Sequence, residues 1–199
     1  MSSPSTRRAL PGRLVHAVAI GVAAIVLVLD QATKALAVAE LSDRTIDLGV
    51  MDLRLVRNLN AAFSLPVGIF PGFFLVVTVV VVVVVVRSLP QVDRLSVASA
   101  FGLVLGGVLG NAVDRMTRAP GFPDGAVVDF FDLRWWPVFN IADMAIVGGA
   151  TLLALLLTLV EREQRAAAGT LSAPSSAPSS APSSGPSSGP SSGRATGSG

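Results

Sequence analysis

Residues 66–86 read PVGIFPGFFLVVTVVVVVVVV, and this stretch indicates the class of protein. It holds eight consecutive valines, Val79 to Val86, and no charged side chain. Valine is a weak helix former in water. In a lipid bilayer, however, every backbone N–H and C=O group must find a partner within its own segment. A run of this length therefore predicts a helix that crosses a membrane.

Three further apolar runs have a similar length. The first extends from Leu14 to Leu29 and resumes, after Asp30 and Lys34, as far as Ala39. The other two cover residues 95–113 and 137–160. Each is close to the roughly 20 residues that a helix needs to cross the hydrocarbon layer. We therefore predict an all-α membrane protein with four transmembrane helices.

The span at 95–113 carries glycines at every fourth position, namely Gly102, Gly106 and Gly110. Small residues at this spacing lie on one face of a helix and let another helix approach closely. We expect this face to pack against a second span.

Composition excludes several kinds of chemistry. The 199 residues are 51% hydrophobic and 14% charged, with no cysteine and a single histidine, His16. Disulfides, thiolate metal sites, cysteine nucleophiles and histidine-rich zinc sites are therefore excluded. A net charge of +2 gives little reason to expect nucleic-acid binding. We predict no metal and no cofactor, so any chemistry depends on carboxylates.

The chain divides into a folded part, residues 1–166, and a tail rich in Ser, Pro and Gly, residues 167–199. Residues 173–192 are five tetrads of Ala/Gly-Pro-Ser-Ser, which cannot form an apolar core, and we expect the tail to be disordered. Four spans place both termini on one side. Arginines just before the first span favour the cytoplasm for that side. An alternative is a signal peptide cleaved after Ala39, but Asp30 and Lys34 interrupt its apolar region.

Two longer segments lie on the opposite, extracytoplasmic side. Residues 42–57 alternate weakly between apolar and polar side chains, which predicts a small β region at the membrane surface. Residues 122–136 are rich in Pro, Gly and aromatic side chains, and we expect them to form a covering loop or helix. Trp135 and Trp136 at its end are typical of a membrane interface.

Polar residues gather in one layer near the outer ends of the predicted spans. Ionisable residues in a span are unfavourable, which makes them candidates for function. Asp30 and Lys34 have the i,i+4 spacing of an intrahelical ion pair. Asp114 is expected to form an ion pair or to lie at a helix end beside Arg115. The layer consists of Asp30, Lys34, Asn58, Asn111, Asp114, Arg115, Asn140 and Asp143.

Asp143 has no cation three or four residues away on its own helix, so it needs a partner from elsewhere. The candidates are Asp124, Asp129 and Asp132 in the covering segment. Asp124 lies in a Pro-Asp-Gly turn, and the apolar neighbours of Asp129 favour it over Asp132 without excluding the latter. Two carboxyl groups in a site of low dielectric share a proton, and such a pair can activate water. A small proton-coupled carrier and a membrane scaffold are the alternatives.

The sequence resembles a known family, the lipoprotein signal peptidases, also called signal peptidase II. The resemblance covers most of residues 14–160 and rests on five motifs in order. They are Asp30-Gln31-Ala32-Thr33-Lys34, Asn58-Leu59-Asn60-Ala61-Ala62-Phe63-Ser64, the Gly-Gly-x-x-Gly-Asn-x-x-Asp-Arg motif at 106–115, Val127-Val128-Asp129-Phe130 and Phe139-Asn140-Ile141-Ala142-Asp143. Asn60 stands where the family usually has glycine.

The resemblance implies a membrane-embedded aspartic endopeptidase of the bacterial plasma membrane, with its active site near the outer face. Such an enzyme removes the signal peptide from a diacylglyceryl-modified prolipoprotein, just before the lipidated cysteine. It implies catalytic roles for Asp129 and Asp143. Substrate-binding or supporting roles are implied for Asp30, Lys34, Asn58, Asn111, Asp114, Arg115 and Asn140. The expected partners are the prolipoprotein and the bilayer, and we expect a monomer.

Overall fold

The computed structural model describes residues 11–59 and 72–171. It contains two compact units, residues 1–162 and 163–199. The described part of the second unit is the last section of a helix, ending at Leu171. Asn60 and most of the predicted tail lie outside the described residues. Residues 167–171, at the start of that tail, are helical.

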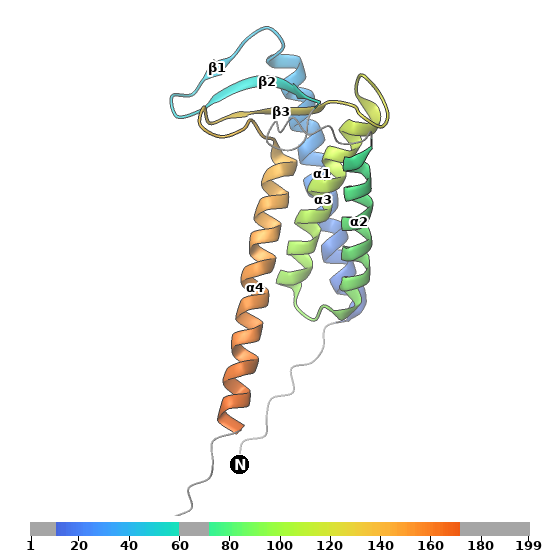
Figure 1. The fold of residues 1–199 in the computed structure, drawn as a ribbon, viewed down its shortest axis with the longest axis vertical. Helices are drawn as coiled ribbons and strands as arrows, with labels where there is room; N and C mark the ends of the chain where they lie inside the picture. Colours follow the sequence, from blue (N-terminus) through green and yellow to red (C-terminus); the bar gives the residue numbers. More distant parts are fainter. Residues whose placement is uncertain (1–10, 60–71, 172–199) are drawn as a thin grey trace, which may run out of the picture. The chain divides into compact units, whose positions relative to one another are not determined.

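Four long helices, three short strands and a 3-10 turn make up the described fold (Figure 1). In chain order they are α1 (Gly12–Glu40), β1 (Ile46–Asp47), β2 (Asp52–Asn58), α2 (Phe73–Ser88), η2 (Leu89–Gln91), α3 (Leu95–Thr117), β3 (Val127–Asp132) and α4 (Ile141–Leu171). Within the described residues, four helices are long and apolar enough to cross a membrane. The prediction of an all-α membrane fold with a small β region is confirmed.

Two helices begin later than the apolar runs suggest. α2 begins at Phe73, after Gly72 in a left-handed conformation (φ 79°). α4 begins at Ile141 rather than at Pro137, because Phe139 is hydrogen-bonded to β3. Phe139 exchanges backbone hydrogen bonds with Phe131, and this bridge keeps residues 137–139 out of the helix.

The strands form one antiparallel sheet in the order β1-β2-β3. Figure 1 shows the sheet at the end of the bundle where α1 and α3 finish and where α2 and α4 start. The third strand comes from the segment that was expected only to cover this face. It brings Asp129 opposite Val56 of β2. Buried apolar side chains of β3, Val128 and Phe130, pack on the last turn of α1.

The glycines of α3 face α1 and α4 at close range. A β-carbon at Gly102 would lie 2.6 Å from the carbonyl oxygen of Ala19, and one at Gly106 would lie 2.7 Å from that of Ala23. Both oxygens belong to α1. A β-carbon at Gly107, the next residue of α3, would also come too close to the carbonyl oxygen of Ala142 in α4. The small-residue stripe therefore sets how closely the helices approach.

The close approach predicts a steep cost for one added methyl group. Gly106→Ala should destabilise the protein by about 1–3 kcal/mol, because the methyl group would overlap the α1 backbone. The control is Gly21→Ala in α1, where a β-carbon meets nothing within 4 Å. Melting temperatures in detergent should fall for Gly106→Ala and stay level or rise for Gly21→Ala. Equal melting of the two variants would contradict this account of the α1–α3 contact.

Candidate active site at the sheet end of the bundle

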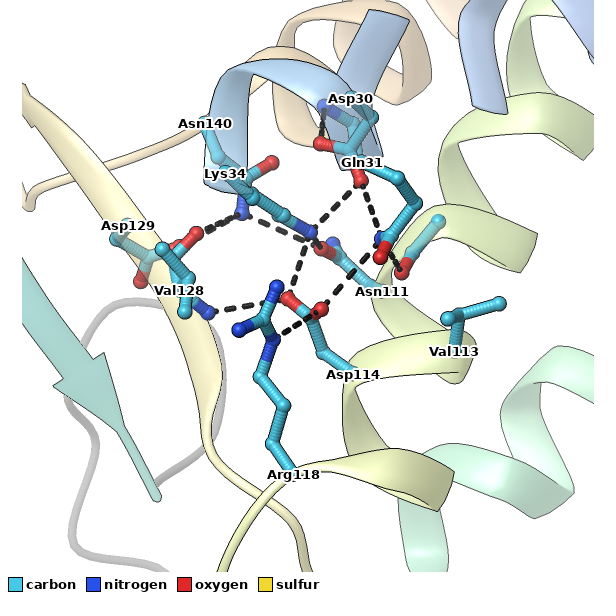
Figure 2. Close-up of polar contacts among 12 residues, drawn as sticks. Asp30, Gln31, Lys34, Asn111, Val113, Asp114, Arg118, Val128, Asp129 and Asn140 are labelled. Carbon is cyan, nitrogen blue, oxygen red and sulfur yellow. Dashed lines mark hydrogen bonds and ion pairs between the residues drawn. The ribbon is translucent and has the colours of Figure 1, made fainter. Parts of the chain in front are cut away.

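A buried lysine lies at the centre of the polar layer (Figure 2). Lys34, in α1, has no solvent-exposed surface. Its Nζ lies 2.8 Å from Asp30 Oδ2, 2.9 Å from Asp114 Oδ2 and 2.9 Å from Asn111 Oδ1. An ammonium group has three N–H donors, and each of them has an acceptor here. The predicted Asp30–Lys34 pair is therefore present, and it is one part of a larger cluster.

Two residues that were not predicted complete this cluster. Arg118 Nε donates to Asp114 Oδ1 at 2.6 Å, and the i,i+4 spacing of these two residues was a signal that could have been used. Gln31 Nε2 donates to Asp30 Oδ2 at 3.1 Å and to the Gly110 carbonyl oxygen at 3.0 Å. The cluster thus holds two acids and two bases, so its formal charges balance.

The same carboxylates hold the elements that carry the candidate catalytic residues. Asp114 Oδ2 accepts from the backbone N–H of Val128 in β3 at 3.1 Å. Asp30 Oδ1 accepts from the backbone N–H of Ala142, in the first turn of α4, at 2.9 Å. The first N–H groups of a helix have no partner within the helix, so Asp30 acts as a cap supplied by another span. β3 and α4 are therefore both attached to the Lys34 cluster.

Asn140 and Asp143 cap the start of α4 reciprocally. The Asp143 N–H donates to Asn140 Oδ1 at 3.0 Å, and the Asn140 N–H donates to Asp143 Oδ2 at 3.2 Å. This is the arrangement of a capping box. Asn111 Nδ2 donates to the other oxygen, Asp143 Oδ1, at 2.9 Å. Asp143 was expected several residues inside a span, and because α4 begins at Ile141 it lies in the first helical turn instead.

Asp129 enters the site from β3 and is 3% exposed. Its Oδ1 accepts from Asn140 Nδ2 at 2.7 Å, and its Oδ2 accepts from Asn58 Nδ2 at 3.0 Å. Burial raises the pKa of Asp129 to about 6, and the charge of Asp143 acts in the same direction. The two amide donors partly oppose this rise. Asn140 thus contacts both carboxyl groups, which brings Asp129 and Asp143 to one place.

The two other candidate partners of Asp143 lie elsewhere. Asp132 pairs with Arg54 Nε and accepts from the backbone N–H of Arg134 at 2.7 Å. These contacts hold the pKa of Asp132 below its ordinary value. Asp124 Oδ1 accepts from the Gly72 N–H at 3.1 Å. Side chains alternate between the two faces of a strand, so positions 129 and 132 cannot share a face.

Both Asp129 and Asp143 line a pocket of about 720 Å³. Three more of the predicted residues line it as well, namely Asn58, Asn111 and Arg115. Its other walls are mainly apolar and come from α2, α3, residues 133–139 and α4. Asp30, Lys34, Asp114 and Asn140 do not line the pocket, and their contacts place them behind it.

Arg115 stands at the edge of the pocket beside α2. Its Nη1 donates to the carbonyl oxygens of Leu59 at 3.2 Å and Gly125 at 3.1 Å, and its guanidinium lies 4.6 Å from the centre of the Phe74 ring. These contacts join the loop after β2 to the loop before β3. Among the described residues, no group of three or more His, Cys, Asp or Glu side chains is arranged to hold a metal ion.

Residues 22–159 match the family model described as signal peptidase (SPase) II. The chain belongs to the signal peptidase II family. The matched range includes every residue of the candidate site, from Asp30 to Asp143.

Individual relatives agree with this assignment. A lipoprotein signal peptidase of Rhodococcus jostii (strain RHA1) is 48% identical over 145 residues, covering 71% of this chain and 72% of that one. A lipoprotein signal peptidase of Mycobacterium avium (strain 104) is 45% identical over 143 residues, covering 69% and 76%. A bacterial membrane enzyme solved by the in meso method at 2.3 Å has a TM-score of 0.61 and 27% identity, covering 70% of this chain and 87% of that chain.

Family membership, together with the four apolar helices, makes the chain a multi-pass bacterial membrane protein and a protease. It therefore favours hydrolysis over the carrier and scaffold alternatives. The described residues of the five motifs, which are separate in the sequence, meet at the sheet end of one bundle.

The buried cluster predicts that loss of Lys34 is severe. Lys34→Met would leave two buried carboxylates with one fewer counter-charge, and removal of one partner of a buried pair typically costs about 3–5 kcal/mol. We expect a large drop in the melting temperature of the purified protein in detergent. The matched control is Arg44→Met, which removes another i,i+4 ion pair, the exposed one between Arg44 and Glu40. That variant should melt like the wild type. A wild-type melting temperature for Lys34→Met would show that the cluster does not hold the fold.

Proposed function

We propose that this protein is an aspartic endopeptidase in which Asp129 and Asp143 activate one water molecule to cut a peptide bond. The observation that carries the proposal is that both carboxyl groups line one pocket and bind the same residue, Asn140. Two carboxyl groups at such a site cannot both ionise readily, so one retains a proton. The raised pKa of Asp129 fits a proton that is shared near neutral pH.

The reaction needs only this pair and water. The ionised carboxylate takes a proton from water, whose oxygen attacks the carbonyl carbon of the scissile bond. The protonated carboxyl donates its proton to the carbonyl oxygen, which gives a tetrahedral intermediate. Breaking the C–N bond then releases the amine, which takes a proton from the carboxyl group that was protonated by water, while a hydroxyl group of the intermediate returns a proton to the other carboxylate as the new carboxyl group forms. Asn58, Asn111 and Asn140 keep the carboxyl groups oriented through these steps by their amide hydrogen bonds.

The proposed substrate is a prolipoprotein whose cysteine carries a diacylglyceryl group. The curated relatives are named lipoprotein signal peptidases. The apolar walls of the pocket suit a substrate that is partly lipid. Successive turns of α2, α3 and α4 also line an adjoining apolar groove of about 380 Å³, between Val80 and Val84 on one side and Ala150 and Leu153 on the other. Together these surfaces support the binding of an apolar chain that lies along the helices.

We further propose that the termini are cytoplasmic and that the site lies near the outer face of the membrane. Arg13, in the first turn of the first span, supports this orientation. The enzyme is proposed to act as a monomer, because one chain supplies both carboxyl groups and the pocket around them.

The proposed catalytic pair, which we call the Asp129–Asp143 dyad, predicts that each of the two carboxyl groups is indispensable. Asp129→Asn and Asp143→Asn should each remove nearly all cleavage of a diacylglyceryl-modified precursor in detergent, while the melting temperature stays near that of the wild type. The matched control is Asp43→Asn, which changes an exposed carboxylate just after α1 that does not line the pocket. Cleavage at the wild-type rate by either dyad variant would rule out the mechanism.

The hydrogen bond from Asn58 predicts a shift in the pH profile. It lowers the pKa of Asp129, so Asn58→Ala should raise that pKa. Asp129 would then keep its proton to a higher pH, and the alkaline limb of the rate profile should move upward in pH. The control is Arg57→Gln, an exposed neighbour in β2. An unchanged limb in Asn58→Ala would mean that Asp129 does not supply the proton.

A further inference from the structure

One wall of the pocket is a loop that leaves β3 and returns to it. We call residues 132–139 the wall loop. Most of it lines the pocket together with the two carboxyl groups: Leu133, Trp135, Trp136, Pro137, Val138 and Phe139. Its return is held by Phe139, whose N–H donates to the Phe131 carbonyl oxygen at 3.1 Å and whose carbonyl oxygen accepts from the Phe131 N–H at 2.9 Å. These two hydrogen bonds fix the base of the loop at Phe131, two residues from Asp129.

Arg134 does not line the pocket, and its backbone is unusual. Its φ angle is 67°, in the left-handed region that a residue with a β-carbon rarely adopts. Asp132 Oδ1 closes the turn by accepting from the Arg134 N–H at 2.7 Å. A conformation of this kind persists only where surrounding contacts compensate for it.

The guanidinium of Arg134 provides such contacts. It binds Asp52 with two parallel bonds, Nε to Oδ2 at 3.0 Å and Nη2 to Oδ1 at 2.6 Å. Nη2 also lies 2.9 Å from Asp47 Oδ1, and Nη1 donates to the Gly49 carbonyl oxygen at 3.1 Å. Bidentate pairs of this type fix geometry as well as charge. They attach the wall loop to the hairpin formed by β1 and β2.

The next two residues, Trp135 and Trp136, are 76% and 47% exposed. Their ring centres are 5.8 Å apart. An apolar ligand that covers large, exposed apolar side chains at the mouth of a pocket gains binding affinity from their burial. This affinity is greatest where the side chains are held in place before binding, because ordering a loop during binding reduces affinity.

We propose that Arg134 is a positioning residue that holds the wall loop on the β1–β2 hairpin, and so presents Trp135 and Trp136 to the apolar part of the substrate. Its effect is on substrate affinity rather than on the rate of bond cleavage. The affinity part of this inference rests on the proposed peptidase function. The attachment of the loop does not depend on that function.

The composition of the chain supplies a direct probe of the loop. Trp135 and Trp136 are the two tryptophans of the protein, and it has no tyrosine. Intrinsic tryptophan fluorescence therefore reports on the wall loop alone. Arg134→Gly is the informative variant, because glycine accepts the left-handed backbone while the guanidinium is lost. Asp52→Asn is the second variant, because it keeps Arg134 and removes its charged bidentate partner. The control is Arg44→Gly, which removes an exposed arginine paired with Glu40.

The first measurement is acrylamide quenching of tryptophan fluorescence in detergent micelles without substrate. We expect clearly stronger quenching in Arg134→Gly, a smaller increase in Asp52→Asn and no change in Arg44→Gly. Wild-type quenching in Arg134→Gly would overturn the proposal. If that variant does not fold, wild-type quenching in Asp52→Asn would overturn it.

The second measurement is steady-state cleavage of a diacylglyceryl-modified precursor peptide. For Arg134→Gly we expect KM to rise roughly fivefold to tenfold, with kcat within about twofold of the wild type. A fall in kcat at unchanged KM, or no change in either constant, would overturn the role in affinity. A wild-type protein that cleaves nothing would refute the proposed function, and the quenching result would still decide whether Arg134 holds the loop.

Discussion

The end of the helix bundle that carries the sheet depends on the ionic contacts of Lys34. An ammonium group without exposed surface, in a bundle of membrane-spanning helices, is stable only if every donor has a partner and opposite charges lie close. Asp30 and Asp114 supply the charges, and Asn111 supplies the third acceptor. Asp30 uses its other oxygen, Oδ1, to accept from the N–H of Ala142, and Asp114 Oδ2 accepts from the N–H of Val128 as well as binding Lys34. One buried cation thereby joins α1 and α3 to α4 and β3.

This arrangement explains how a site built from a helix end and a strand is held in register. Asp143 belongs to the first turn of α4, and Asp129 belongs to β3. Asn140 binds both, and Asn111 connects Asp143 to the Lys34 cluster. The amide side chains therefore form the layer between a structural ion cluster and the two carboxyl groups. Because an amide has both a donor and an acceptor end, contact of Asn111 Oδ1 with Lys34 directs its Nδ2 towards Asp143.

The two sides of the pocket are held by different means. The side with the carboxyl groups rests on buried ionic and amide contacts. The opposite side consists of apolar faces of α2 and α4 together with the wall loop. The wall loop carries exposed tryptophans and is attached by Arg134 at the protein surface, where removing one partner of an ion pair costs less than in the interior. In the proposed function, the buried side serves the cleavage of the peptide bond and the apolar side receives the lipid-modified substrate.

The sequence by itself determined the features that depend on local chemistry. The apolar runs predict four helices, because lipid leaves the backbone no other partners. The spacing of Asp30 and Lys34 predicts their pairing, because i and i+4 side chains are neighbours on any helix. The glycines at every fourth position of α3 predict a close helix contact, because residues at this spacing lie on one face of any helix. The five motifs also identify the family before any coordinates are considered. None of these inferences needs a contact between distant parts of the chain.

Only the tertiary structure decided which distant groups meet. Residues 127–132 are a strand because β2 offers hydrogen bonds to them, and only a strand sends Asp129 and Asp132 to opposite faces. Asp114 pairs with Lys34 because α3 packs on α1 through its glycines. α4 begins at Ile141 because Phe139 is bound to Phe131. In each case the deciding contact joins two separate segments of the fold, so the outcome depends on packing that no local pattern encodes.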